Sequence, residues 1–190
     1  MEADFAVELG ADDETLEIPW ASPNNGPRYH DLKRHAEYLP RIEETTRVPE
    51  LGQFLTALNS PGSTLETAKC DVWSSSDMNP DEDIFGATHK FCSYVDVLFS
   101  DEASRFSFAQ HEQFVRDLVE LLRKAPEIPA STEFLIRRCY YHSAASTRDG
   151  FYITFYLFGY GNDELQARQR WTVAIELIEN AIKQTASSSH

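Results

Sequence analysis

Residues 151–160 have the sequence FYITFYLFGY, and this short segment decides most of the fold. Aromatic and β-branched side chains dominate it, which is typical of a strand, and Asp149-Gly150 just before it marks a turn. The next stretch, residues 163–183, spaces its apolar side chains three and four apart, which predicts a long amphipathic helix. We therefore expect an aromatic strand followed by a helix that packs on one face of its sheet.

The same order of elements occurs once before in the chain. Residues 90–100 predict a strand, and residues 107–124 predict a helix with a continuous apolar face. A further strand precedes each of these pairs, at residues 67–74 and 133–142. The sequence thus predicts an internal repeat of a strand–strand–helix unit, whose first hairpin loop, residues 77–86, is the longer one.

A ββαββα chain has few compact arrangements. Hairpin pairing and right-handed crossovers place residues 90–100 and 151–160 at the centre of one sheet, with both helices on the same face. The expected fold class is therefore α+β: a two-layer sandwich with a four-stranded antiparallel sheet and two helices. This is the layout of a permuted ferredoxin-like domain, and we assign it to residues 65–184.

Residues 1–64 do not follow this pattern and predict an N-terminal arm that packs on the main domain. The arm is acidic at first and then rich in proline, asparagine and glycine. Leu16, Ile18 and Trp20 alternate within it as apolar side chains that can dock on another surface.

Two short helices are expected within the arm. The first follows Tyr29 and ends at Pro40, and the second runs from Pro49 to Asn59, where proline suits the first helical position. At the other end of the chain, residues 185–190 are small and polar and predict a flexible tail.

The charge of the chain limits its partners. With 31 acidic against 17 basic residues, the formal net charge is −14, which argues against nucleic-acid and anionic-membrane partners. No apolar run approaches the roughly 18 residues of a membrane-spanning helix, and the acidic N-terminus is unlike a signal peptide. The three cysteines, Cys70, Cys92 and Cys139, show no CxxC spacing. We therefore expect reduced thiols and a cytoplasmic protein.

The candidate site is the face of the sheet that the two helices leave uncovered. A face so rich in aromatic side chains has to be covered by the arm, by a second subunit in a homodimer, or by a ligand. Alternation along the strands assigns to this face, as candidate ligand-binding residues, Asp71, Trp73, Tyr94, Asp96, Arg138, His142, Tyr152 and Tyr156.

Two acidic side chains of this face lie on adjacent predicted strands. Asp71 and Asp96 could share a proton and act in acid/base chemistry, or they could join a cross-strand network with Lys69 and Arg138. The second interpretation is the simpler one.

Two other motifs are considered and set aside. The acidic loop 77–83 spaces its oxygen ligands as calcium loops do, but it lacks the glycine and the closing glutamate of an EF-hand. Gly159 and Gly161 precede a helix, where phosphate loops occur, yet acidic residues already occupy that helix start. We expect a solvated loop and a tight turn, with no metal and no cofactor.

Three functions remain open. The first is a non-enzymatic binding or regulatory module that holds a small molecule or a protein on the aromatic face. The second is a small enzyme that uses Asp71, Asp96 and His142 on the same face. The third is an acidic inhibitor or immunity-type protein that binds a basic partner through charge.

Overall fold

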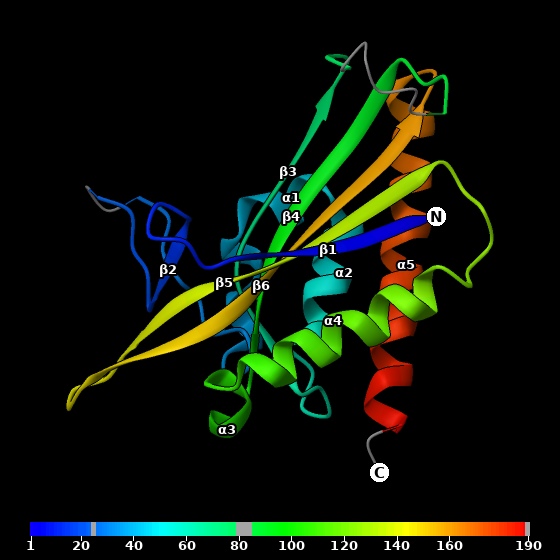
Figure 1. Ribbon diagram of the computed structural model, residues 1–190. Helices are drawn as coiled ribbons and strands as arrows, with labels where there is room; N and C mark the ends of the chain where they lie inside the picture. Colours follow the sequence, from blue (N-terminus) through cyan, green and yellow to red (C-terminus); the bar gives the residue numbers. More distant parts are fainter. Residues whose placement is uncertain (24–25, 79–84, 189–190) are drawn as a thin grey trace.

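The structure, a computed structural model, describes residues 1–23, 26–78 and 85–188. It is α+β, with one mixed sheet and several helices (Figure 1). The strands are β1 (Glu2–Glu8), β2 (Thr15–Ile18), β3 (Leu65–Ser75), β4 (His89–Phe99), β5 (Ala130–His142) and β6 (Thr147–Gly161). The helices are the 3-10 helix η1 (Ala36–Arg41) and the α-helices α1 (Glu43–Arg47), α2 (Pro49–Leu58), α3 (Glu102–Arg105), α4 (Phe108–Leu122) and α5 (Glu164–Ser188).

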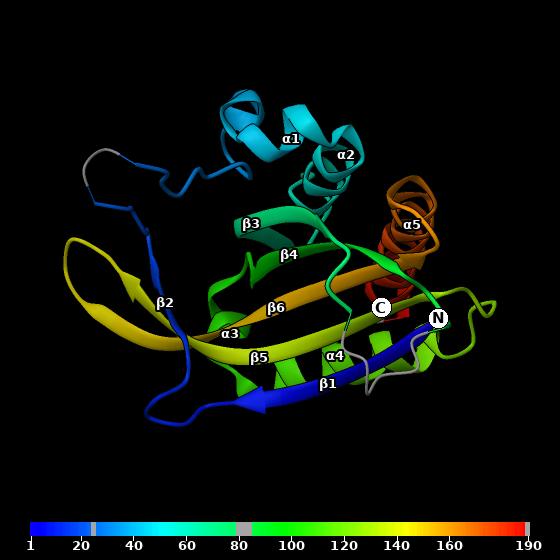
Figure 2. The same ribbon diagram turned by 90° about the horizontal axis from the view of Figure 1, so that it is seen from above.

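The described strands form a six-stranded sheet in the order β1-β5-β6-β4-β3, with β2 also on β5 (Figure 2). The four strands from β3 to β6 pair with one another in antiparallel fashion, and β4 and β6 lie side by side between β3 and β5 as predicted. β1 and β2 follow one another along the outer side of β5, and both run parallel to it. The predicted four-stranded antiparallel sheet is therefore too small, because the sheet has six strands and is mixed.

The physical reason for the two additional strands lies in the alternation of β1. Ala3 and Phe5 face the core, whereas Glu2 and Asp4, which alternate with them, are exposed. One face of β1 is thus buried, although the strand as a whole is rich in acidic residues. The first part of the predicted arm is in fact an edge of the sheet.

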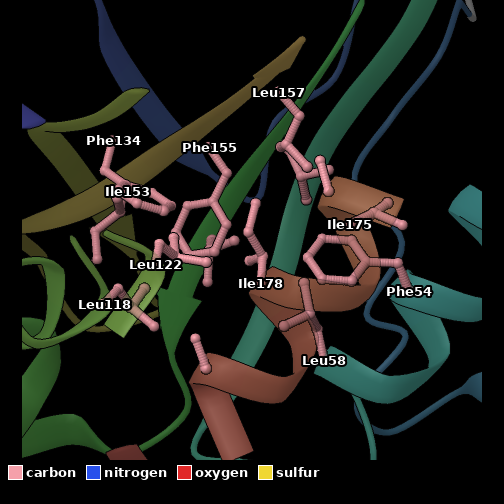
Figure 3. Close-up of a cluster of buried hydrophobic side chains, with 14 of the residues drawn as sticks. Phe54, Leu58, Leu118, Leu122, Phe134, Ile153, Phe155, Leu157, Ile175 and Ile178 are labelled. Carbon is pink, nitrogen blue, oxygen red and sulfur yellow. The ribbon is translucent and has the colours of Figure 1, made fainter. Parts of the chain in front are cut away.

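The core lies between the sheet and three helices (Figure 3). Helices α2, α4 and α5 all cover the same face, and α2 adds Phe54 and Leu58 from the N-terminal region. The strands contribute alternate side chains to this core, as half-buried strands do. Figure 3 labels Phe134 of β5, three side chains of β6 (Ile153, Phe155 and Leu157), and two each of α4 (Leu118 and Leu122) and α5 (Ile175 and Ile178).

Glycines allow the long helix α5 to approach β6 closely. A Cβ atom placed on Gly159 would lie 2.3 Å from the carbonyl oxygen of Ala167 and from the amide nitrogen of Trp171. The Trp171 indole then donates a hydrogen bond of 2.9 Å to Ser93 of β4. Close packing of helix on strand thus accounts for this glycine, and Asp163 caps the helix by accepting from the amide of Gln166.

The helices of the N-terminal region differ in part from the prediction. Helix α2 matches the predicted segment, but the chain before it forms the 3-10 helix η1 rather than a helix that ends at Pro40. At the C-terminus, α5 continues to Ser188, so part of the predicted tail is helical. None of the described helices has the length and apolar composition needed to cross a membrane.

Candidate functional site

The face of the sheet opposite α2, α4 and α5, which we call the open face, carries the candidate site. Register across five strands places one residue from each strand in a single row. Because paired residues in a sheet point to the same face, the five side chains lie next to one another. In order from the β1 edge to the β3 edge, this row is Asp4, Glu133, Tyr156, Tyr94 and Asp71.

Aromatic rings continue from this row along β6 and onto β3. Ring centroids lie 6.5 Å apart for Trp73 and Tyr94, and 6.1 Å apart for Tyr94 and Tyr156. Along β6 the corresponding distances are 6.4 Å for Tyr156 and Phe158 and 6.3 Å for Phe158 and Tyr160. These five rings form a continuous strip across three strands, which we call the aromatic band.

The N-terminal region covers the other half of the open face. Leu16 and Ile18 of β2 pack with Leu98, Tyr141 and Tyr152 in a second apolar cluster. Beyond β2 the chain crosses to the far edge of the sheet. There the Trp20 indole donates a hydrogen bond of 2.8 Å to the carbonyl of Ala68 in β3.

Four of the five rings of the aromatic band stay accessible, and the fifth, Tyr160, is buried. Trp73 is 38% exposed, and Tyr94, Tyr156 and Phe158 are partly exposed. The N-terminal region therefore covers one half of the open face and leaves the other half uncovered. The exposed half is the one that holds the aromatic band.

Carboxylates border the band on both sides. On the β1 side, Glu2, Asp4 and Glu133 are exposed, and they line a hollow of about 560 Å³ that reaches the ring of Phe158. On the β3 side, the Asp71 side chain is 50% exposed and lies 3.9 Å from Arg47. The accessible half of the open face thus combines large rings with negative charge, and we call these four carboxylates the acidic border.

A buried polar network lies beside the aromatic band. Thr154 donates a hydrogen bond of 2.7 Å to the carboxyl of Asp96 and receives one of 3.2 Å from Arg137. Arg137 also forms ion pairs with Glu8 at 2.7 Å and with Glu14 at 3.3 Å. The network therefore links central strand β4 to the N-terminal region through β6 and β5.

The pKa of Asp96 is raised to about 7, mainly by burial and also by the negative charge of Glu14, against the opposing effects of Thr154, Lys69 and Arg137. The Tyr152 hydroxyl is buried and makes no hydrogen bond to any residue within 1–23, 26–78 and 85–188. Its pKa is also raised, first by burial and then by the charge of Asp96. Burial thus favours the protonated form of both groups, and Asp96 is only 3% exposed.

The structure brings some of the predicted site residues together and separates others. Asp71, Trp73, Tyr94 and Tyr156 lie in or beside the aromatic band, with Asp96 and Tyr152 buried on the same face. Arg138 and His142 do not join them.

Register explains why Arg138 is absent from the site. Arg138 pairs with Phe151, which packs with the core, whereas Arg137 pairs with Tyr152 on the open face. His142 lies near the hairpin tip, where its ring nitrogens contact Thr147 and Glu17. A shift of one residue in β5 exchanges the two faces, so the arginine of the site is Arg137.

Sequence reasoning missed Asp4, Glu133 and Arg137. For the last two a signal is present, because Phe134 and Ile136 are the apolar positions of β5 and must face the core. Their odd-numbered neighbours then face the other way. Asp4 carries no comparable signal, since the strand that positions it is short and acidic.

The cysteines are unreactive in this fold. Burial raises the pKa of the Cys70 thiol to about 12, and it does the same to Cys139. Cys92 is fully buried, and its pKa is raised to about 11. The protonated thiol is a poor nucleophile, so these side chains serve packing. The loop considered for calcium falls mostly in residues 79–84, outside the residues that the structure describes.

No protein-family model, curated protein or solved structure matches this chain.

Proposed function

We propose that this protein is a non-enzymatic binding module that docks a basic protein partner on the exposed half of its open face. The observation that carries the proposal is the row of Asp4, Glu133, Tyr156, Tyr94 and Asp71, which places two tyrosines between carboxylates. The tyrosine rings would provide the contact surface, and the carboxylates beside them would attract positive charges of the partner.

The aromatic band has the properties of an interface centre. Tyrosine and tryptophan supply a large contact area with few rotatable bonds, and they are enriched among residues whose truncation weakens binding. Here the rings project from neighbouring strands and contact one another, so little side-chain freedom remains to be lost on binding. The electron-rich faces of Tyr94 and Tyr156 also attract guanidinium and ammonium groups.

The acidic border gives the surface its preference for a basic partner. Asp4 is held 3.6 Å from Arg123 and Asp71 3.9 Å from Arg47, and these cations neutralise them only in part because both carboxylates are well exposed. Glu2 and Glu133 add further exposed negative charge. With a net charge of −14 behind it, this face attracts cations from a distance and repels acidic proteins.

The same geometry gives less support to an enzyme on this face. Asp71 lies opposite Tyr94 and Asp96 lies opposite Lys69, so the two carboxylates are not direct neighbours. His142 lies at the far end of the β5–β6 hairpin beside Glu17. Catalytic groups need to reach one common point, and these residues serve different parts of the fold.

The proposal can be tested by selecting a displayed library of random peptides on the immobilised protein. We expect the enriched peptides to be rich in arginine and lysine and to bind less well as salt is raised, because salt screens exposed charges. Replacing Tyr94→Ser and Tyr156→Ser together should weaken their binding roughly tenfold or more.

The matched control is Leu165→Ser, because Leu165 is 68% exposed on α5, outside the open face. This variant should bind the selected peptides as the wild type does, and thermal melts should show that both proteins are folded. Enriched peptides without positive charge, or peptides that bind the tyrosine variant at full strength, would rule the proposal out.

A further inference from the structure

A cavity of about 210 Å³ lies beyond the β3 edge of the sheet, away from the aromatic band. It is enclosed by the N-terminal segment that follows β2, by the start of α1, by α2 and by β3. Its large apolar lining residues, which we call the apolar wall, are Trp20, Leu32, Ile42 and Leu55. The volume is below the range of about 300–1,000 Å³ that is usual for drug-sized ligands, so the cavity suits a molecule of about one ring.

Three cations line this cavity. Arg28, Arg41 and Lys69 form no ion pair with a carboxylate in the part of the chain that the structure describes. Lys69 lies opposite Asp96, but burial favours the neutral form of that carboxyl. Three positive side chains therefore meet at one cavity without an ionic partner.

Cations at a neighbouring groove are arranged differently. In the groove between the segment after β2 and the β5–β6 hairpin, Arg105 pairs with Glu66 at 2.7 Å and Arg34 with Asp31 at 2.8 Å. Arg148 in the same groove pairs with Glu102. Nine of the 17 lysines and arginines form an ion pair with a carboxylate among the described residues, so the distinguishing feature of the cavity is that three unpaired cations meet there.

Aromatic rings hold two of these cations in place. The guanidinium of Arg41 lies 4.1 Å from the ring centre of Tyr38, and the ammonium of Lys69 lies 5.8 Å from that of Trp20. Such contacts orient a cation without neutralising it. The pKa of His30, which also lines the cavity, is lowered first by burial and then by the charges of Arg41 and Arg28. The charges of Arg41 and Arg28 thus make the potential at His30 positive, whereas at Cys70, on the β3 side of the cavity, negative charges that include Glu44 act in the opposite direction.

Two carboxylates also line the cavity and limit what it can hold. Glu43 and Glu44 both belong to α1, and Glu44 lies 3.9 Å from Arg47. Their negative charge opposes a polyanion. A ligand with one anionic group and an otherwise apolar body fits the charges and the apolar wall together.

We propose that this cavity binds a small organic anion, whose carboxylate or phosphate group lies among Arg28, Arg41 and Lys69 and whose apolar body lies against Trp20. This site is separate from the aromatic band and from its proposed partner. The anion would join the N-terminal region to β3, two parts of the chain that meet at the cavity.

Benzoate and phenyl phosphate are suitable probes, and benzamide is the neutral counterpart of benzoate. We expect each anion to bind one site saturably in calorimetry and to change the fluorescence of Trp20. Benzamide should bind at least tenfold more weakly, because it offers no charge to the three cations. The double variant Arg28→Gln/Arg41→Gln should lose tenfold or more in benzoate affinity.

Two controls separate this site from general charge effects. Arg138→Gln removes an exposed cation elsewhere and should leave benzoate affinity unchanged. Glu43→Gln should tighten binding by removing a repelling carboxylate. Failure of both anions to bind, equal binding of benzamide, or full binding by the double arginine variant would overturn the proposal. The Tyr94→Ser/Tyr156→Ser variant should still bind benzoate, so the two proposals can fail independently.

Discussion

The carboxyl group of Asp96 has a higher pKa in the folded protein than in the unfolded chain. In the unfolded chain an aspartate loses its proton near pH 4, whereas burial holds the pKa of folded Asp96 at about 7. Between these two values the native protein binds more protons than the unfolded chain. Stability contributed by this residue therefore falls as the pH rises from about 4 to about 7, and it is constant above that range.

Replacing Asp96→Asn should remove this dependence. Between pH 5 and pH 8, the free energy of unfolding of the variant should rise relative to that of the wild type. The rise should reach up to about 4 kcal/mol, which corresponds to the full difference in the Asp96 pKa between the folded and unfolded states. Urea unfolding of both proteins at several pH values measures this difference, and other titrating groups cancel because both proteins contain them. A difference that does not change with pH would show that Asp96 ionises normally in the fold.

At the residue scale, the sequence predicts which side chains belong to the open face where apolar alternation is clear. It places Tyr94, Asp96, Tyr152 and Tyr156 on that face, and the structure does the same. In β5 two arginines follow one another, and composition alone does not distinguish them. Their assignment depends on register, which long-range pairing sets.

At the scale of elements, the close contact of β6 with α5 depends on Gly159. Gly159→Ala would force a methyl group against the helix backbone, where neither the Ala167 carbonyl nor the Trp171 amide can move alone. We expect a loss of about 3 kcal/mol or more in the free energy of unfolding, measured with urea. Gly62→Ala is the matched control, because a Cβ there meets no atom within 4 Å, and it should change stability by less than about 1 kcal/mol.

Among the elements, long and periodic ones are predictable and short edge strands are not. Strands β3 to β6 and helices α2, α4 and α5 all occur where apolar spacing places them. β1 and β2 escape detection because a strand of four to seven residues gives little alternation, and its pairing partner lies far along the chain. Their existence depends on the exposed side of β5, which is a property of the assembled sheet.

The molecule as a whole should unfold as one unit, because its N-terminal region contributes to both the sheet and the core. Residues 1–64 supply β1, β2 and the core side chains of α2. A fragment of residues 65–190 would expose the outer side of β5 and the apolar surface that α2 covers. We expect the full chain to show one cooperative urea transition by circular dichroism and tryptophan fluorescence.

The fragment of residues 65–190 should show no comparable cooperative transition under the same conditions. The full chain with Gly62→Ala, which leaves both regions intact, serves as the reference for handling and expression. A fragment that unfolded cooperatively at the urea midpoint of the full chain would show that the N-terminal region is a separate appendage.

The parallel pairing of β1 with β5 has a consequence for how the chain is made. Glu2 pairs with Ser131, so β1 leaves the ribosome long before its partner exists. In that interval the strand presents unpaired backbone groups that could join another nascent chain. Glu2, Asp4 and Glu8 place like charges along it, and a second copy would be repelled by them. We therefore expect the acidity that conceals this strand in the sequence to disfavour pairing between two nascent copies until β5 has been made.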